Sequence, residues 1–181
     1  MKVKTTLILL VAFVAMACRQ QSREYALEQR IMDCFYQEQE AKGLAAKKSL
    51  HQLQKLFIKH DILAGKSGQD YLNVIYQIRD SGKLPSASPE LLAALSQLEY
   101  MPGGIKCQGM SDIAADREKW ASSKIWKVES LFDATERAGD ISAQVIAEEA
   151  ARHFTAQDFE NEYYRSLFLI VISFGLAAAP M

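Results

Sequence analysis

The stretch TAQDFENEYYRSLFLIVISFGLAAA, residues 155–179, carries the clearest helix signal in this chain. Thr155 stands three residues before Asp158, the spacing of a capping box, and Phe154 and Phe159 occupy the flanking positions of a hydrophobic staple. From Leu167 to Ala179 the sequence is apolar on every face, which is typical of a buried central helix. As a helix this run is only about 20 Å long, too short to cross a bilayer. We therefore expect it in the core of the domain.

The rest of the chain also favours helices, since no stretch alternates as a half-buried strand does. Apolar residues recur at helical spacing over 23–42, 45–64 and 112–138, and also after Ser67, Ser88 and Ser142. Gly43 and Gly65 are the expected stops of the first two helices, and Ser67 with Asp70 forms an approximate capping box. The sequence predicts an all-α fold, a compact bundle of six or seven helices with a buried C-terminal helix. A single helical domain covers 23–181.

Residues 1–17, MKVKTTLILLVAFVAMA, have the features of a signal peptide. Lys2 and Lys4 form a charged start, an apolar run of eight residues covers 7–14, and Ala-Met-Ala at 15–17 fits the small-residue cleavage pattern. The run is shorter than the roughly 20 residues that cross a bilayer as a helix. We therefore expect an exported protein, with a buried first helix or a membrane anchor as the alternatives.

Cys18 is the first residue after this cleavage pattern. The stretch from Ala15 to Cys18 resembles the lipobox of bacterial lipoproteins, although Ala15 stands where the family favours Leu and Met16 where it favours a small residue. The resemblance implies a diacylglycerol on Cys18 and a short tether, residues 18–22, that holds the domain close to a membrane. Ordinary secretion, which leaves Cys18 as an N-terminal thiol, is the alternative.

Cys34 and Cys107 are the two remaining cysteines. Exported proteins enter oxidising compartments where disulfides persist, so this even pair predicts a disulfide between them. The bridge would pin the loop that contains Cys107 onto the first helix. Two buried free thiols are the alternative.

Four polar side chains in the C-terminal part are candidates for chemistry: Glu149, His153, Asp158 and Glu162. Glu149 and His153 could hold half of a metal site, but this spacing more often gives a surface contact on a helix. Asp158 and Glu162 would share a helix face as paired carboxylates, yet acidic residues in a first turn also favour the helix dipole. We therefore expect no catalytic residue, no metal and no cofactor, and treat the four as a polar patch.

The charge of the chain is balanced, with 21 basic and 22 acidic residues among 181. Nucleic-acid binding needs a clustered basic face, and the balance of charge gives no sign of one. No polybasic stretch for anionic lipid stands out either. We expect no nucleic-acid partner, and attachment to a membrane through the N-terminal lipid.

A second resemblance rests on GDISAQVIA, residues 139–147, followed by TAQDFENEYYR, residues 155–165, behind the lipobox-like leader. This arrangement is similar to groups of small helical envelope lipoproteins of bacteria, and the similarity implies no activity. We expect a lipid-anchored protein of the cell envelope, a non-catalytic module that binds a protein partner or serves as an accessory. A periplasmic immunity protein or inhibitor of a toxin or hydrolase is the first alternative, and an enzyme with a site not visible in the sequence is the second.

Overall fold

The computed structural model describes residues 25–97, 105, 107, 115, 123–128 and 143–178. Within them the chain forms six α-helices, one 3-10 turn and a single helical turn at 125–128, with no strand. The elements are α2 (Ala26–Ala41), α3 (Ala46–Lys59), α4 (Gly68–Ser81), α5 (Pro89–Gln97), α8 (Ala143–His153), η1 (Asp158–Glu160) and α9 (Glu162–Ala178). The prediction of an all-α fold with six or seven helices is confirmed. The leader, Cys18 and most of the helix expected over 112–138 lie outside the described residues.

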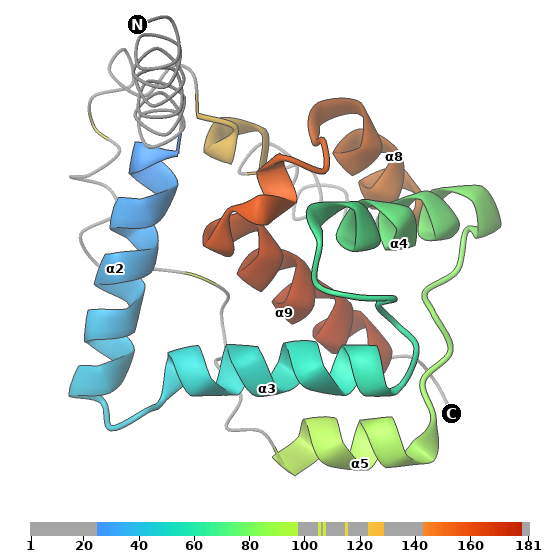
Figure 1. Ribbon diagram of the computed structural model, residues 1–181, viewed down its shortest axis with the longest axis horizontal. Helices are drawn as coiled ribbons and strands as arrows, with labels where there is room; N and C mark the ends of the chain where they lie inside the picture. Colours follow the sequence, from blue (N-terminus) through green and yellow to red (C-terminus); the bar gives the residue numbers. More distant parts are fainter. Residues whose placement is uncertain are drawn as a thin grey trace, which may run out of the picture.

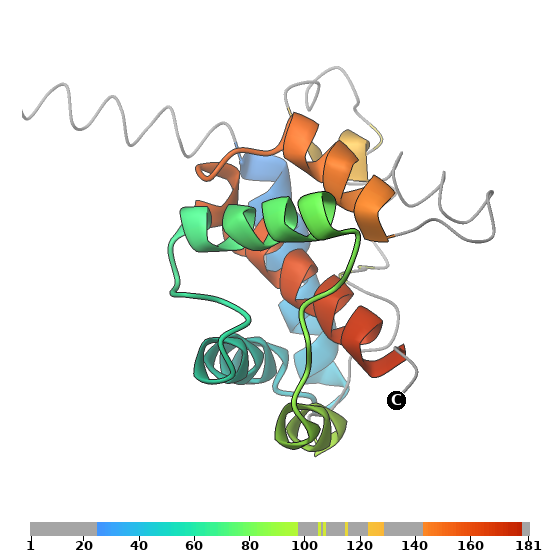
Figure 2. The ribbon, with the colours of Figure 1, turned by 90° about the vertical axis from the view of Figure 1, so that its right-hand side faces the viewer.

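Helix α9 is the centre of the arrangement. It crosses the domain between the α4–α8 pair and the α3–α5 pair, with α2 beside it (Figure 1, Figure 2). It contacts α2, α3, α4 and α5, while α4 packs along α8. Most large side chains of α9 are buried, as expected for a core helix: Tyr163, Tyr164, Phe168, Leu169, Ile170, Ile172 and Leu176. No helix among the described residues is long and apolar enough to span a membrane.

One face of α9 differs from the expectation. Phe174 was expected in the core, but its side chain is 40% exposed, and Leu167 and Val171 are only partly buried. These three residues follow one another at helical spacing and form a single stripe. The stripe is therefore the least buried apolar face of α9.

Several helix boundaries follow the predicted capping signals. The Ser67 hydroxyl accepts a hydrogen bond from the Asp70 amide, and the Asp70 carboxylate accepts one from the Ser67 amide, so the capping box of α4 is complete. The Ser88 hydroxyl accepts from the Leu91 amide at 3.1 Å and begins α5. Gly43, after α2, has the positive φ of 77° that favours glycine.

Helix α3 ends at Lys59, earlier than the predicted stop at Gly65. The chain reverses at Asp61, which has a left-handed φ of 56°. The amides of Ile62 and Leu63 then donate to the carbonyl of Phe57 at 2.8 and 3.1 Å. This reversal buries both side chains, which a continued helix would have pointed in different directions.

The last helix begins at Glu162, not at Thr155, so the prediction of its start was wrong. The Asp158 carboxylate accepts the Thr155 amide at 2.7 Å, as in a capping box, but the Thr155 hydroxyl donates to that same carboxylate at 2.8 Å. The chain makes only the 3-10 turn η1, and the Asn161 side chain then accepts the Tyr163 amide to start α9. Asp158 and Glu162 therefore do not lie on one helix.

The turn around η1 is fixed by α4. The Glu160 carboxylate accepts a hydrogen bond from the Gly68 amide at 2.6 Å, at the N-terminus of α4 where the helix dipole favours negative charge. A side chain at position 68 would overlap the carbonyl oxygen of Ala156, so the close approach requires glycine. The predicted staple contact is present next to it, with the rings of Phe154 and Phe159 6.0 Å apart.

Candidate functional site

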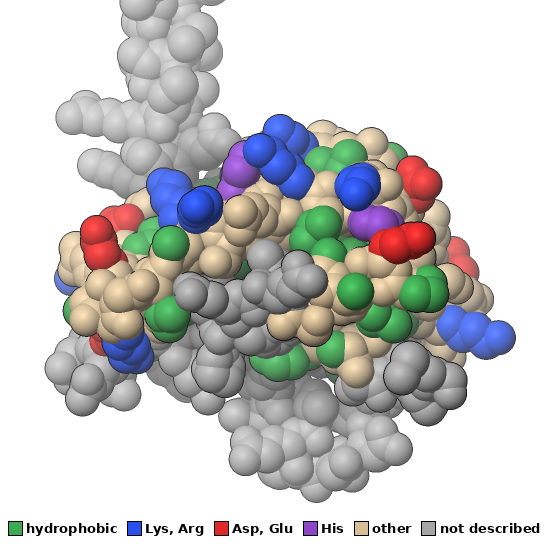
Figure 3. All heavy atoms as spheres, turned by 90° about the horizontal axis from the view of Figure 1, so that it is seen from below, with side chains coloured by type: hydrophobic (Ala, Val, Ile, Leu, Met, Phe, Trp, Pro, Cys, Tyr) green, Lys and Arg blue, Asp and Glu red, His purple; other side chains and the backbone are tan. Residues whose placement is uncertain are grey.

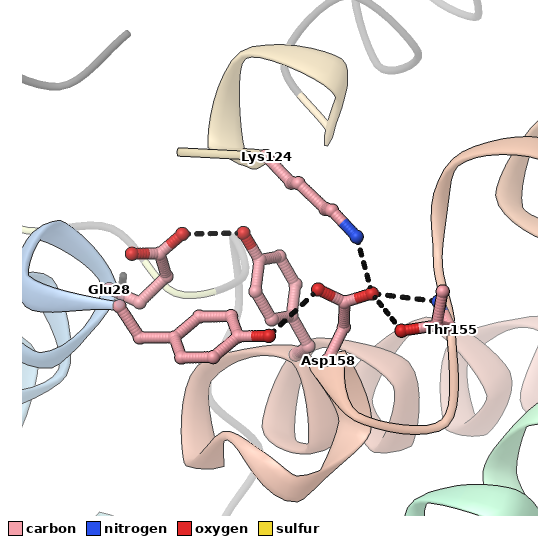
Figure 4. A network of polar contacts seen from close by, with 6 residues as sticks. Glu28, Lys124, Thr155 and Asp158 are labelled. Carbon is pink, nitrogen blue, oxygen red and sulfur yellow. Dashed lines mark hydrogen bonds and ion pairs between the residues drawn. The ribbon is translucent and has the colours of Figure 1, made fainter. Parts of the chain in front are cut away.

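Two carboxylates, Glu28 of α2 and Asp158 of η1, lie inside the domain with 0% and 1% of their surface exposed (Figure 4). Charged groups are seldom buried unless partners replace the water that they lose. Tyr25 and Tyr164 lie between the two carboxylates, with their rings 6.2 Å apart. The four side chains thus form a buried polar network that joins the first described helix to the C-terminal segment.

Asp158 has a full set of partners. Its Oδ2 atom accepts from the Lys124 ammonium at 2.6 Å and from the amide and hydroxyl of Thr155, and its Oδ1 atom accepts from the Tyr25 hydroxyl at 3.0 Å. Burial acts to raise the pKa of Asp158, but the hydrogen bonds from Lys124 and Thr155 outweigh it and hold this pKa below its usual value. Asp158 is therefore an ionised structural anchor for the turn.

Glu28 is less completely satisfied. Its Oε1 atom accepts from the Tyr164 hydroxyl at 2.6 Å and from the Ser123 hydroxyl at 2.8 Å, while Oε2 has no hydrogen-bond partner in the described part of the chain. Burial, together with the neighbouring Glu28, raises the pKa of Tyr164 well above its usual value. The Tyr164 hydroxyl therefore stays protonated and acts as a hydrogen-bond donor.

The structure divides the four candidate residues of the predicted polar patch. Glu149 and His153 contact each other on α8, with Oε2 and Nε2 3.5 Å apart, as expected for a surface pair. Glu162 instead accepts the Tyr36 hydroxyl of α2 at 2.8 Å, and burial and Glu162 together raise the pKa of Tyr36. Asp158 belongs to the buried network. The last two carboxylates therefore hold α2 against the C-terminal segment at separate points.

An apolar pocket lies between α4, α8 and α9, with a volume of about 340 Å³. Helix α9 contributes Leu167 and Val171 of the stripe described above, together with Gly175. Its walls are almost entirely hydrocarbon and aromatic ring, and the remaining lining residues are Ile75, Ile78, Leu84, Val128, Ala143, Ile146, Ala147, Ala150, Phe154, Phe159, Tyr164, Phe168 and Ile172.

Tyr164 belongs both to the pocket wall and to the polar network. The Tyr164 hydroxyl donates its hydrogen bond to Glu28, so this polar group is not free to bind a ligand in the pocket. The ring of Tyr164 contributes apolar surface to the pocket wall. The ring packs edge-on against Tyr163 and at an angle against Phe154, with centroids 5.2 Å apart in both pairs. The network thus keeps the wall of the pocket apolar and fixed in place.

Cys34 and Cys107 form a disulfide with their Cα atoms 5.9 Å apart, in agreement with the predicted bridge. Glu38 lies one turn further along α2, with a carboxylate oxygen 3.9 Å from the Cys34 sulfur. Among the described residues these three are the only group of donors close enough together to hold a metal ion. Because two of them are joined by the disulfide, they are not available as thiolate ligands.

The sequence singled out Asp158 but not Glu28, Lys124 or Tyr25. Glu28 stands among helix-forming residues and looks like an ordinary exposed position, since a buried carboxylate is rare. One signal was present: positions 27, 28, 31, 32 and 35 form a helical stripe, and position 28 is the polar member of it.

No protein-family model, curated protein or solved structure matches this chain.

Proposed function

We propose that this protein is an exported, lipid-anchored envelope module that acts by binding, and that the pocket between α4, α8 and α9 is its ligand site. The single observation that carries the proposal is a partly open apolar pocket between α4, α8 and α9 that no side chain of the described residues fills. Protein interiors are close-packed, with few voids larger than a water molecule. An apolar cavity of about 150 Å³ is already enough to bind benzene, and this pocket has about 340 Å³.

The lining identifies the chemical class of the ligand. Binding sites normally combine apolar walls with a few polar groups that fix orientation, whereas here the one tyrosine hydroxyl is already occupied by Glu28. On α9 the lining runs from Tyr164 to Gly175, about 16 Å along the helix axis, so the pocket is elongated. A flexible hydrocarbon chain, such as the acyl chain of a lipid-like molecule, fits these walls best.

The N-terminal leader supports a function at a membrane. The lipobox-like sequence before Cys18 implies an anchor at a membrane, where molecules with acyl chains are concentrated. Each buried methylene group contributes roughly 0.8 kcal/mol, so a chain gains affinity with its length until the pocket is full. A non-catalytic carrier or sensor of such a chain needs no acid–base residue in the pocket.

Binding of a neutral naphthylamine dye tests the proposal. We expect the dye to fluoresce with the folded protein and lauryl alcohol to displace it. In the variant Ala150→Phe the new ring occupies the pocket, so dye binding should fall at least tenfold while the melting temperature is kept or raised. Val171→Phe fills the pocket from α9 and serves as a second variant.

The matched control is Ala93→Phe, an alanine to phenylalanine change at an exposed position of α5. It should leave dye binding unchanged. Dye binding that survives both pocket variants, or that falls equally in the control, would contradict the assignment of this pocket as the ligand site.

A further inference from the structure

Helix α3 has a charge pattern that no other described helix shows. It carries Lys47, Lys48, Lys55 and Lys59 and no acidic residue, and the chain has no Asp or Glu between positions 41 and 60. The other described helices that carry lysine or arginine carry acidic residues as well. The whole chain has a formal net charge of −1, so this concentration of positive charge is local.

Three of these lysines lie on one line. At 3.6 residues per turn, positions 48, 55 and 59 fall within an arc of about 40° and extend over about 16 Å of helix. They lie opposite the buried stripe that includes Leu50 and Phe57, and all three side chains are exposed. We call Lys48, Lys55 and Lys59 the basic face of α3. Figure 3 views the domain from the side on which α3 and α5 lie, and shows Lys, Arg and His side chains in a row along this surface.

The charges of this face are not neutralised within the described part of the chain. Lys48, Lys55 and Lys59 form no ion pair there, whereas Lys124, Arg79 and Arg152 each have a carboxylate partner. The nearest acidic residues in sequence, Glu40 and Asp61, lie beyond the two ends of the helix. An anionic partner would therefore meet three unpaired ammonium groups at once.

We propose that the basic face of α3 binds the surface of an anionic phospholipid bilayer. Lysine is a strongly hydrated point charge on a flexible stem, which suits a diffuse layer of phosphate groups. Arginine and aromatic side chains are favoured at the centres of protein interfaces, and lysine is depleted there; α3 has no arginine, and its aromatic residue, Phe57, is buried. The apolar side of α3 is used in the core, so the helix rests on headgroups and does not insert.

This contact does not depend on the pocket or on lipidation of Cys18. It rests on charge, so it should weaken steeply with salt because screening shortens the range of attraction. A protein that exchanges an acyl chain with a membrane would gain from such a face, since it brings the domain to the bilayer surface.

Flotation of the full chain with vesicles tests this inference. We compare vesicles of phosphatidylglycerol mixed with phosphatidylcholine against vesicles of phosphatidylcholine alone, and take the difference as the electrostatic part of binding. Lys2 and Lys4 of the leader also favour anionic vesicles, but their contribution is common to every variant, so a change between variants reports on the substituted lysines. The triple variant Lys48→Gln, Lys55→Gln, Lys59→Gln should reduce this difference roughly a hundredfold at low salt, at about fivefold per lysine.

The matched control replaces three exposed lysines elsewhere, Lys66→Gln, Lys83→Gln and Lys127→Gln, and removes the same total charge. It should bind anionic vesicles to within a fewfold of the unmodified chain, and circular dichroism should show both triple variants folded. Equal binding by the unmodified chain and the α3 variant would overturn the inference and would leave an acidic protein surface as the partner to test. An equal loss in the control would also overturn it, because net charge and not this face would then set the affinity.

Discussion

The ion pair between Lys124 and Asp158 gives the sharpest test of how the C-terminal turn is held. Lys124→Met removes the ammonium group but keeps most of the aliphatic stem. The Asp158 carboxylate, 1% exposed, would keep its bonds to Tyr25 and Thr155 and lose the one opposite charge. An unpaired charge would then remain in the interior.

The size of the effect follows from the burial of the two groups. Removing one partner of a fully buried ion pair costs about 3–5 kcal/mol. The Lys124 side chain is 32% exposed, so water screens part of the attraction and the expected loss is smaller. We expect the free energy of unfolding to fall by about 2–3 kcal/mol near pH 7. Lys127→Met, three residues further along at an exposed position, should change it by less than about 0.5 kcal/mol.

The dependence on pH has a definite sign. In the unmodified protein the pKa of Asp158 is lower when folded than when unfolded. Its contribution to stability is therefore complete above the unfolded value of about 3.9 and is lost as the pH falls through the folded pKa. In Lys124→Met, burial still raises the pKa of Asp158 but the ammonium group no longer lowers it, so this pKa is higher than in the unmodified protein. Protonation then relieves the buried charge, and the difference between variant and unmodified protein should shrink from about pH 7 to about pH 4.

Urea unfolding followed by circular dichroism at several pH values measures this difference. A loss that is the same at about pH 4 and about pH 7 would show that Lys124 stabilises by packing and not by charge. A loss as small as that of Lys127→Met would show that the ion pair does not hold the turn.

Four further outcomes are expected. Gly68→Ala should destabilise the protein by about 2 kcal/mol or more in urea unfolding, since backbone occupies the space of the new methyl group; an unchanged midpoint would contradict the close contact. The double variant Cys34→Ser, Cys107→Ser should lower the free energy of unfolding by up to about 4 kcal/mol, because it frees a long loop. In the unmodified, unreduced protein, mass spectrometry should find neither cysteine alkylated. Truncation after Arg165 should abolish the cooperative melt, because it removes most of the buried side chains of α9; a retained melt would mean that the helix is an appendage. Cys18→Ala should end incorporation of labelled fatty acid, and continued labelling would exclude this cysteine as the lipid site.

Local rules predicted the parts of the fold that local interactions determine. The capping box at Ser67 and the Ser88 cap depend on side chains three residues from the amides they bind, so the printed sequence contains both partners. The helical stripe of α2 and the apolar run of α9 could be predicted because they too depend on neighbouring positions in the sequence. Predictions failed where a distant partner decided the outcome. Thr155 and Asp158 have the spacing of a capping box, but Tyr25 and Lys124 bind the same carboxylate and leave it in a turn.

The pocket could not be predicted from the sequence, because it forms where the side chains of neighbouring helices do not fill the space between them. Hydrophobic periodicity predicts that a side chain is buried. It does not predict whether another side chain packs against it. Leu167 and Val171 belong to the predicted core stripe, and in sequence they are indistinguishable from the buried Ile170. What separates them is the spacing of α4 and α8 from α9, which is set at the near end by the Glu160 bond to the start of α4 and by the aromatic cluster around Phe159. Glu160 does not line the pocket, yet its contact with α4 helps to position the wall that Phe159 and α4 contribute.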